Sequence, residues 1–138
     1  MKRETGRVTG KRILLVEDEL VVRETLRRCF ALDSHSVVEA NNGAEALTLF
    51  RIGEFDLIVI DFEMPFIKGN ELAARIKQAA PNQRILMITA FHHRPGVENP
   101  VDLVLNKPFG SERLRETVNK LLSRPGENAE ARMTQRAG

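Results

Sequence analysis

The sequence of 138 residues contains no tryptophan, no tyrosine, one cysteine and no uninterrupted apolar run longer than four residues. The short runs exclude a membrane-spanning helix, which needs about 20 apolar residues, and the pattern of a secretory signal is absent. The single Cys29 cannot form an internal disulfide and is typical of a reducing compartment. We therefore expect a cytoplasmic protein.

Neither sign of charge is in large excess. The chain has 21 Lys and Arg against 19 Asp and Glu, a formal net charge of +2. This surplus is too small to indicate nucleic-acid binding, and the lack of Trp and Tyr removes the rings that stack best on bases. We expect no nucleic-acid partner and no membrane insertion.

Four short apolar runs, each followed by polar residues, are the most informative feature that is present. They cover residues 13–16, 57–60, 85–88 and 103–105. Aliphatic runs of this length are typical of strands buried on both faces of a parallel sheet. A further short strand is predicted over 36–40, and segments with helical spacing of apolar residues separate most of these strands. The alternation predicts an α/β fold, with a doubly wound five-stranded parallel sheet over residues 11–124.

Several residues predict where helices begin or end. Asn70 can cap one helix, and Gly53 stands where another is expected to stop. Two prolines and a glycine interrupt residues 91–100, so we expect a loop or a single turn there, that is, a shortened or irregular fourth helix. Residues 1–10 and 125–138 are expected to form a flexible arm and a flexible tail.

The polar residues behind the strands form a chemically coherent set. Glu17 and Asp18 follow the first apolar run, Asp61 the second, Thr89 the third, and Lys107 comes shortly after the last. Ligand sites in open α/β sheets lie beyond the carboxyl ends of the strands, so these side chains should converge. Three carboxylates, a hydroxyl and an ammonium group at one place indicate transfer of a phosphoryl group to a carboxylate.

Such a transfer requires positioning and neutralisation of negative charge. Mg²⁺ (or Mn²⁺) suits this task because it takes oxygen ligands, keeps several waters and needs only one or two carboxylates. We expect Asp18 and Asp61 to ligate the ion directly and Glu17 to hold it through water. Lys107 would face the acceptor or phosphoryl oxygen as a point charge, and Thr89 would donate its hydroxyl to the phosphoryl group.

Over residues 11–124 the sequence resembles the receiver domain of two-component response regulators, of the chemotaxis-response-regulator type. The matching elements, in the family's order, are Glu17-Asp18, the acceptor Asp61, the stretch 61–65 leading to Gly69, Thr89-Ala90, and Lys107-Pro108-Phe109. The resemblance implies a flavodoxin-like fold with Asp61 as phospho-acceptor. It also implies that the backbone carbonyl of Glu63 is a further metal ligand and that the peptide bond between Lys107 and Pro108 is cis.

The same resemblance implies a signalling module and not a classical enzyme, one that catalyses only its own phosphoryl transfer and dephosphorylation. The phosphoryl group would come from a histidine kinase or a phosphotransfer protein. We expect no output domain after Arg124. We therefore expect a stand-alone receiver that signals through contacts with a downstream protein whose identity the sequence does not give.

Four positions depart from the family pattern. Val104 replaces the usual Tyr or Phe, so the inward swing of an aromatic ring that normally accompanies movement of the threonine is not available. The stretch between Thr89 and Lys107 is about one helical turn short, from which we hypothesise that the family's usual phospho-dimer does not form on that face. Glu17 replaces Asp, which a water-mediated role tolerates. Lys68 stands where an Asp commonly precedes the glycine, and we interpret it as a change on the surface of a loop.

Two other functions fit part of this sequence. A pseudo-receiver would keep the fold as a binding module without phosphorylation, which Val104 and the altered fourth helix favour. A haloacid-dehalogenase-type phosphatase also uses an aspartate nucleophile, but its acidic pair comes last in the chain, whereas Glu17-Asp18 come first here. His92 and His93 lack a third metal ligand at suitable spacing, so we interpret them as exposed loop residues.

Overall fold

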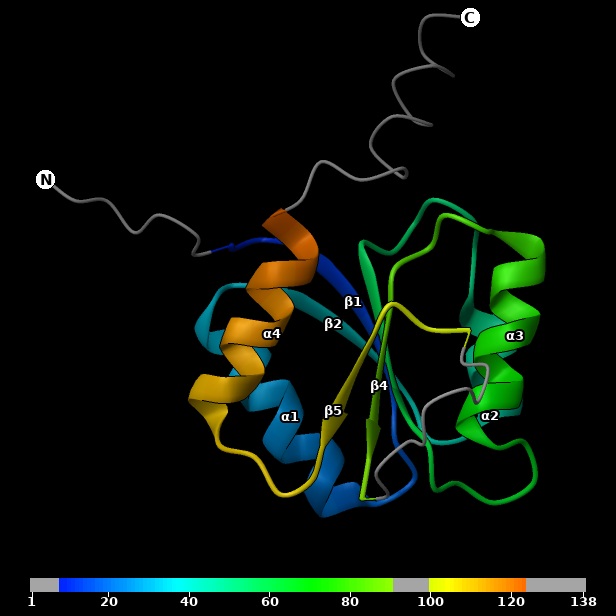
Figure 1. Ribbon diagram of the computed structural model, residues 1–138, viewed down its shortest axis with the longest axis horizontal. Helices are drawn as coiled ribbons and strands as arrows, with labels where there is room; N and C mark the ends of the chain where they lie inside the picture. The colour runs from blue at the N-terminus through cyan, green and yellow to red at the C-terminus, as the bar shows by residue number, and fades with distance from the viewer. Residues whose placement is uncertain (1–7, 91–99, 124–138) are drawn as a thin grey trace, which may run out of the picture.

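The computed structural model describes residues 8–90 and 100–123 as a single open sheet covered by helices on both faces (Figure 1). In chain order the elements are β1 (Arg12–Val16), α1 (Leu20–Leu32), β2 (Ser36–Ala40), α2 (Gly43–Leu49), β3 (Leu57–Asp61), α3 (Gly69–Ala79), β4 (Ile85–Thr89), β5 (Leu103–Asn106) and α4 (Ser111–Ser123). All strand pairs are parallel, in the order β2-β1-β3-β4-β5. The predicted doubly wound five-stranded sheet is confirmed.

The two faces of the sheet carry separate apolar clusters. Successive residues of a strand point to opposite faces, so in β1 Ile13 and Leu15 pack into one cluster and Leu14 and Val16 into the other. Helices α1 and α4 cover the first cluster, and α2 and α3 cover the second (Figure 1). Every residue of β3 and β4 is buried, which explains why these strands are continuous apolar runs without alternation.

Two of the predicted helix ends are wrong. Helix α3 begins at Gly69 with Lys68 in the cap position. Asn70 therefore lies inside the helix and does not cap it. Helix α2 ends at Leu49 with Phe50 as its C-cap, and Gly53 lies in the following turn with φ +80°. The start of α2 has a reciprocal cap that the sequence analysis missed. Asn42 accepts a hydrogen bond from the Glu45 backbone N–H at 2.7 Å, and the Glu45 carboxylate accepts one from the Asn41 N–H at 2.8 Å.

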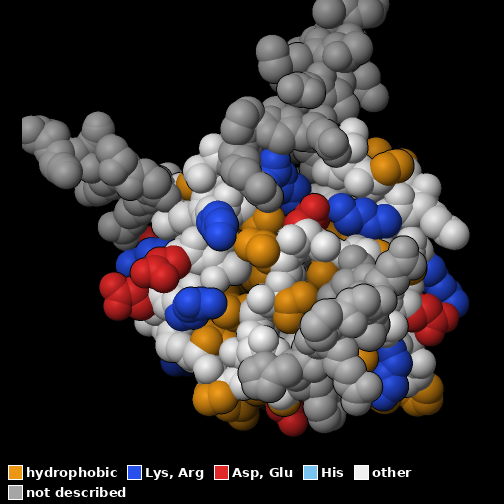
Figure 2. Space-filling model, in the orientation of Figure 1, with side chains coloured by type: hydrophobic (Ala, Val, Ile, Leu, Met, Phe, Trp, Pro, Cys, Tyr) orange, Lys and Arg blue, Asp and Glu red, His pale blue; other side chains and the backbone are white. Residues whose placement is uncertain are grey.

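Several sequence predictions fall on residues outside the described ranges. The shortened fourth helix falls within 91–99, as do His92 and His93, and most of the predicted arm and tail lies in 1–7 and 124–138. Within the described part of the arm, the Val8 N–H donates to the side chain of Asn119. None of the described helices is both long and apolar enough to cross a membrane. On the face shown in Figure 2, Lys and Arg side chains are scattered among acidic and apolar ones.

Phe66, in the loop between β3 and α3, combines a left-handed backbone with an exposed ring. Its φ is +69° and its side chain is 94% exposed. A Cβ atom in this region costs about 1–2 kcal/mol, and asparagine tolerates it better than most residues. We expect Phe66→Asn to raise the free energy of unfolding by about 1 kcal/mol, measured by urea denaturation followed by circular dichroism. Phe66→Ala also has a Cβ but lacks the side-chain amide that can hydrogen-bond to the local backbone, so an equal gain in that control would contradict the explanation.

Candidate functional site

The predicted site residues lie together at the carboxyl edge of the sheet. Asp61 is the last residue of β3 and Thr89 the last of β4, while Glu17 directly follows β1 and Lys107 directly follows β5. The parallel register aligns these ends, because Val16 pairs with Ile60 and the next residues of both strands therefore lie side by side. The site thus occupies the point where the chain reverses its winding, between β1 and β3.

Three carboxylates form the first half of the site. Oxygen atoms of Glu17, Asp18 and Asp61 all lie within 4.8 Å of one another, so a single cation could contact them together. Glu17 and Asp61 are only 1% and 4% exposed, whereas Asp18 is exposed. Oε2 of Glu17 accepts the Glu19 backbone N–H at 3.2 Å, but its buried Oε1 has no hydrogen-bond partner among the described residues. A buried oxygen without a partner suits a cation or a water bound to one.

Burial of like charges changes the titration of this cluster. Burial first, and the neighbouring Asp61 charge second, raise the pKa of Glu17 to about 8. Burial also raises the pKa of Asp61, to about 6, although the ammonium group of Lys107 acts in the opposite direction. Both carboxyl groups therefore hold protons more tightly than free ones. A divalent cation would reverse this by favouring the ionised forms.

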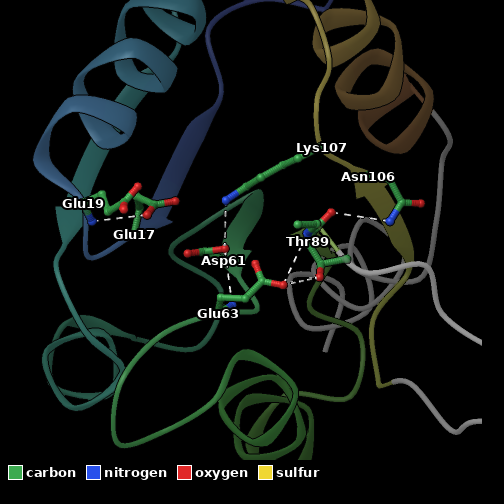
Figure 3. Close-up of polar contacts among 8 residues, drawn as sticks. Glu17, Glu19, Asp61, Glu63, Thr89, Asn106 and Lys107 are labelled. Atoms are coloured by element: carbon green, nitrogen blue, oxygen red, sulfur yellow. Dashed lines mark hydrogen bonds and ion pairs between the residues drawn. The ribbon is translucent and has the colours of Figure 1, made fainter.

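Lys107 supplies the positive charge. Its Nζ lies 3.4 Å from Oδ1 of Asp61, and Figure 3 shows the side chain extended across the site toward that oxygen. Burial alone would lower the pKa of Lys107, but the charges of Asp61 and Glu17 outweigh it and raise that pKa. The Lys107 N–H donates to the Thr89 carbonyl at 2.8 Å, which extends the pairing of β4 with β5. The cis peptide bond between Lys107 and Pro108 is as predicted.

The side chain of Glu63 makes contacts that the sequence analysis did not foresee. Its Oε2 accepts the Thr89 hydroxyl at 2.6 Å and the Ala90 backbone N–H at 3.3 Å (Figure 3). Its own backbone N–H donates to Oδ1 of Asp61 at 3.4 Å. The sequence signal was an acid two positions after Asp61. The direction of that side chain depends on the β3–α3 loop, which the sequence pattern does not specify.

Gly69 brings the start of α3 against Asp61. A Cβ at this position would lie 2.7 Å from the Asp61 carbonyl oxygen and 2.7 Å from the Phe62 Cα. The Gly69 N–H also donates to the Phe62 carbonyl at 3.1 Å. Only glycine lets the helix approach the end of β3 this closely.

Val104, another departure from the family pattern, lies in the part of the chain that the structure describes. This residue lies in β5, paired with Met87 of β4, and its side chain is half-buried. It lines a surface cavity of about 200 Å³ between β5 and α4, together with Arg113, Thr117 and Lys120. A valine at this position has no aromatic ring to swing inward.

The order of the strands and the helices on both faces define a flavodoxin-like α/β protein with its polar site at the switch point. Comparison with known proteins gives the family: the response regulator receiver domain matches residues 13–119. The chain therefore belongs to the receiver-domain family of two-component signalling, as the sequence analysis predicted.

Curated relatives agree with this assignment. The response regulator MprA of Mycobacterium leprae is 35% identical over 126 residues, which cover 87% of this chain and 55% of the relative. MprA of Mycobacterium avium is 34% identical over the same length and coverage. The chain spans about half the length of the curated relatives that it matches.

Solved structures share the architecture. The response regulator TrrA of Thermotoga maritima in complex with Mg²⁺–BeF has a TM-score of 0.75 at 37% identity, covering 81% of this chain and 99% of that one. TrrA in complex with the histidine kinase ThkA has a TM-score of 0.74 at 37% identity, and the match covers 81% of this chain and 98% of that one. The non-phosphorylated HemR receiver domain of Leptospira biflexa has a TM-score of 0.76 at 29% identity, and the match covers 85% of this chain and 99% of that one.

Proposed function

We propose that this receiver accepts a phosphoryl group on Asp61 from the phosphohistidine of a histidine kinase or phosphotransfer protein, and signals through contacts with another protein. One observation carries the proposal: a buried carboxylate lies between an acidic cluster of metal-binding type and an ammonium group. That is the arrangement which the transfer of an anion to an anion requires. We extend the proposal to a receiver unit over residues 11–124 in a cytoplasmic protein.

The transfer itself needs little from the protein beyond position and charge. A carboxylate oxygen of Asp61 bonds to phosphorus while the bond from phosphorus to the donor nitrogen breaks, and the leaving imidazole keeps that electron pair. Lys107 balances the charge on the acceptor carboxylate before the donor arrives. Thr89 and the Ala90 N–H provide donors for the phosphoryl oxygens at the end of β4.

Glu17, Asp18 and Asp61 fit a hard divalent cation, Mg²⁺ or Mn²⁺, by the chemistry of their oxygens and by the unpartnered buried Oε1 of Glu17. When bound, such an ion would supply positive charge that offsets the negative charge of the carboxylate and of the phosphoryl group. We assign Asp18 and Asp61 as direct ligands, Glu17 as a ligand through water, and the Glu63 carbonyl as a further ligand. TrrA, 37% identical, is known in complex with Mg²⁺–BeF.

The phosphodonor has an apolar surface to approach beside Lys107. A groove of about 430 Å³ runs between α1 and the residues after β5, lined by Val21, Val22, Pro108 and Phe109. Val21 is 75% exposed, and the neighbouring Leu20 is 61% exposed. Apolar side chains left in water beside a reactive carboxylate favour docking of a partner protein. We propose this groove as the docking site of the kinase. The similar protein TrrA is known in complex with the histidine kinase ThkA.

The test is direct labelling. Incubating the protein with Mg²⁺ and acetyl phosphate should add one phosphoryl group, detected by intact mass spectrometry. Asp61→Asn should remove that addition, because an amide cannot form the acyl phosphate. Chelation of the cation should slow it strongly in the wild type. Labelling that persists in Asp61→Asn would show that another residue is the acceptor.

Val104 supports the second candidate, a pseudo-receiver that binds partners without being phosphorylated. The same assay separates the two functions, because a pseudo-receiver remains unlabelled with acetyl phosphate and with every phosphorylated kinase or phosphotransfer protein supplied. Lack of labelling by acetyl phosphate combined with labelling by a phosphohistidine protein would support the first proposal.

A further inference from the structure

The strongest unexplained feature of the site is the carboxylate of Glu63. A single oxygen, Oε2, accepts both the Thr89 hydroxyl at 2.6 Å and the Ala90 N–H at 3.3 Å. These are the two donors at the end of β4 that the proposed function assigns to the phosphoryl group. They are therefore already engaged before a phosphoryl group arrives.

We propose that Glu63 is an internal competitor of the phosphoryl group, with its carboxylate holding those donors in the unphosphorylated protein and leaving them on phosphorylation. The inference rests on the proposed function and adds a regulatory role for one residue. It requires no new ligand, because the competing anion is part of the chain.

The Glu63 carboxylate and a phosphoryl group cannot both accept these hydrogen bonds, because each donor has a single proton. The Thr89 hydroxyl has one proton and Ala90 has one N–H, so neither can serve Glu63 and a phosphoryl oxygen at full strength. Charge acts in the same direction, because a phosphoryl group on Asp61 would repel the Glu63 carboxylate. The two groups are close, since the Glu63 N–H donates to Oδ1 of Asp61 at 3.4 Å.

The position of Glu63 also explains how the competitor can leave. In Figure 3 its side chain runs from the segment after β3 across to the end of β4, so a rotation of the side chain releases Thr89 without moving the backbone of Asp61. Glu63 is only half-buried and can reach water when displaced. Because residue 104 is a valine, this displacement gives phosphorylation a structural consequence that does not depend on an aromatic ring.

The competition can be measured with beryllofluoride, the anion seen with Mg²⁺ in the TrrA structure. At saturating Mg²⁺, Glu63→Ala should bind it about tenfold more tightly than the wild type, because breaking a hydrogen bond to a charged group is no longer required. Glu63→Gln, which keeps the shape but loses the charge, should show a smaller gain and serves if the alanine variant folds poorly. Isothermal titration calorimetry gives the affinities without needing a tryptophan.

Two controls separate competition from a general loss of negative charge. Glu19→Gln neutralises an exposed acid beside the site and should leave the affinity within about twofold of wild type. In a Thr89→Ala background the gain from Glu63→Ala should shrink, because the main contested donor is gone. A gain of the same size in that background or in Glu19→Gln would overturn the proposal, as would unchanged or weaker binding by both Glu63 variants.

Failure of the proposed function would look different. If the wild type binds no beryllofluoride and takes no phosphoryl group from acetyl phosphate or a phosphohistidine protein, the site is not a phospho-acceptor and both proposals are wrong. If the wild type is labelled on Asp61 but the Glu63 variants bind no more tightly, only the competition is wrong.

Discussion

Replacing Gly69 with alanine should lower the free energy of unfolding by about 3 kcal/mol, because the new methyl group has no room. It would lie 2.7 Å from both the Asp61 carbonyl oxygen and the Phe62 Cα, and both atoms belong to the backbone at the end of β3. Backbone atoms cannot rotate away as a long side chain can. Either helix α3 withdraws from the sheet, or the residues that follow Asp61 move.

Gly69→Ala should also affect function, because the same backbone positions Asp61 and Glu63. Urea denaturation gives the change in stability, and labelling with acetyl phosphate gives the change in the reactivity of Asp61 that we propose. Gly110→Ala is the matched control, because a Cβ there meets nothing within 4 Å, and its effect should stay within about 0.5 kcal/mol. Equal stability of the Gly69 and Gly110 variants would show that the close approach of α3 is not required.

The sequence predicted the sheet well because its strands are buried on both faces. Strands β3 and β4 have no exposed residue, so the continuous apolar runs 57–60 and 85–88 are enough to predict them. Strand β2 is exposed only at Ser36 and half-buried over the next three residues, and it was still recognisable from Ser36 to Ala40. Helix ends were predicted less well, because Asn70 and Gly53 have favourable local chemistry but the packing against the sheet decides where α3 and α2 begin and end.

The candidate site was predictable to the extent that it follows from strand ends. Glu17, Asp61, Thr89 and Lys107 each stand directly at or after a strand, so the parallel register alone brings them together. The contact of Glu63 with Thr89 was not predictable in this way. It depends on the conformation of the loop after β3, in which Phe66 adopts a positive φ that no sequence pattern indicated.

The affinity for Mg²⁺ should rise by about 100-fold between pH 6 and pH 8, because the cation must displace protons from the site. Burial and the Asp61 charge raise the pKa of Glu17 to about 8, so this carboxyl is largely protonated at pH 6. Asp61, with a pKa of about 6, adds a smaller contribution in the same direction. Isothermal titration calorimetry in buffers of different ionisation enthalpy measures both the affinity and the protons released.

The stability of the metal-free protein should change in the opposite direction. Folded-state pKa values above the unfolded ones mean that the folded chain holds protons which the unfolded chain has released. The free energy of unfolding therefore falls as pH rises from about 4 to about 8, and saturating Mg²⁺ restores it most at the upper end. Glu17→Gln should remove most of the dependence of Mg²⁺ affinity on pH, whereas Glu19→Gln should preserve it. An affinity that is flat across this range in the wild type would show that Glu17 is already ionised before the cation binds.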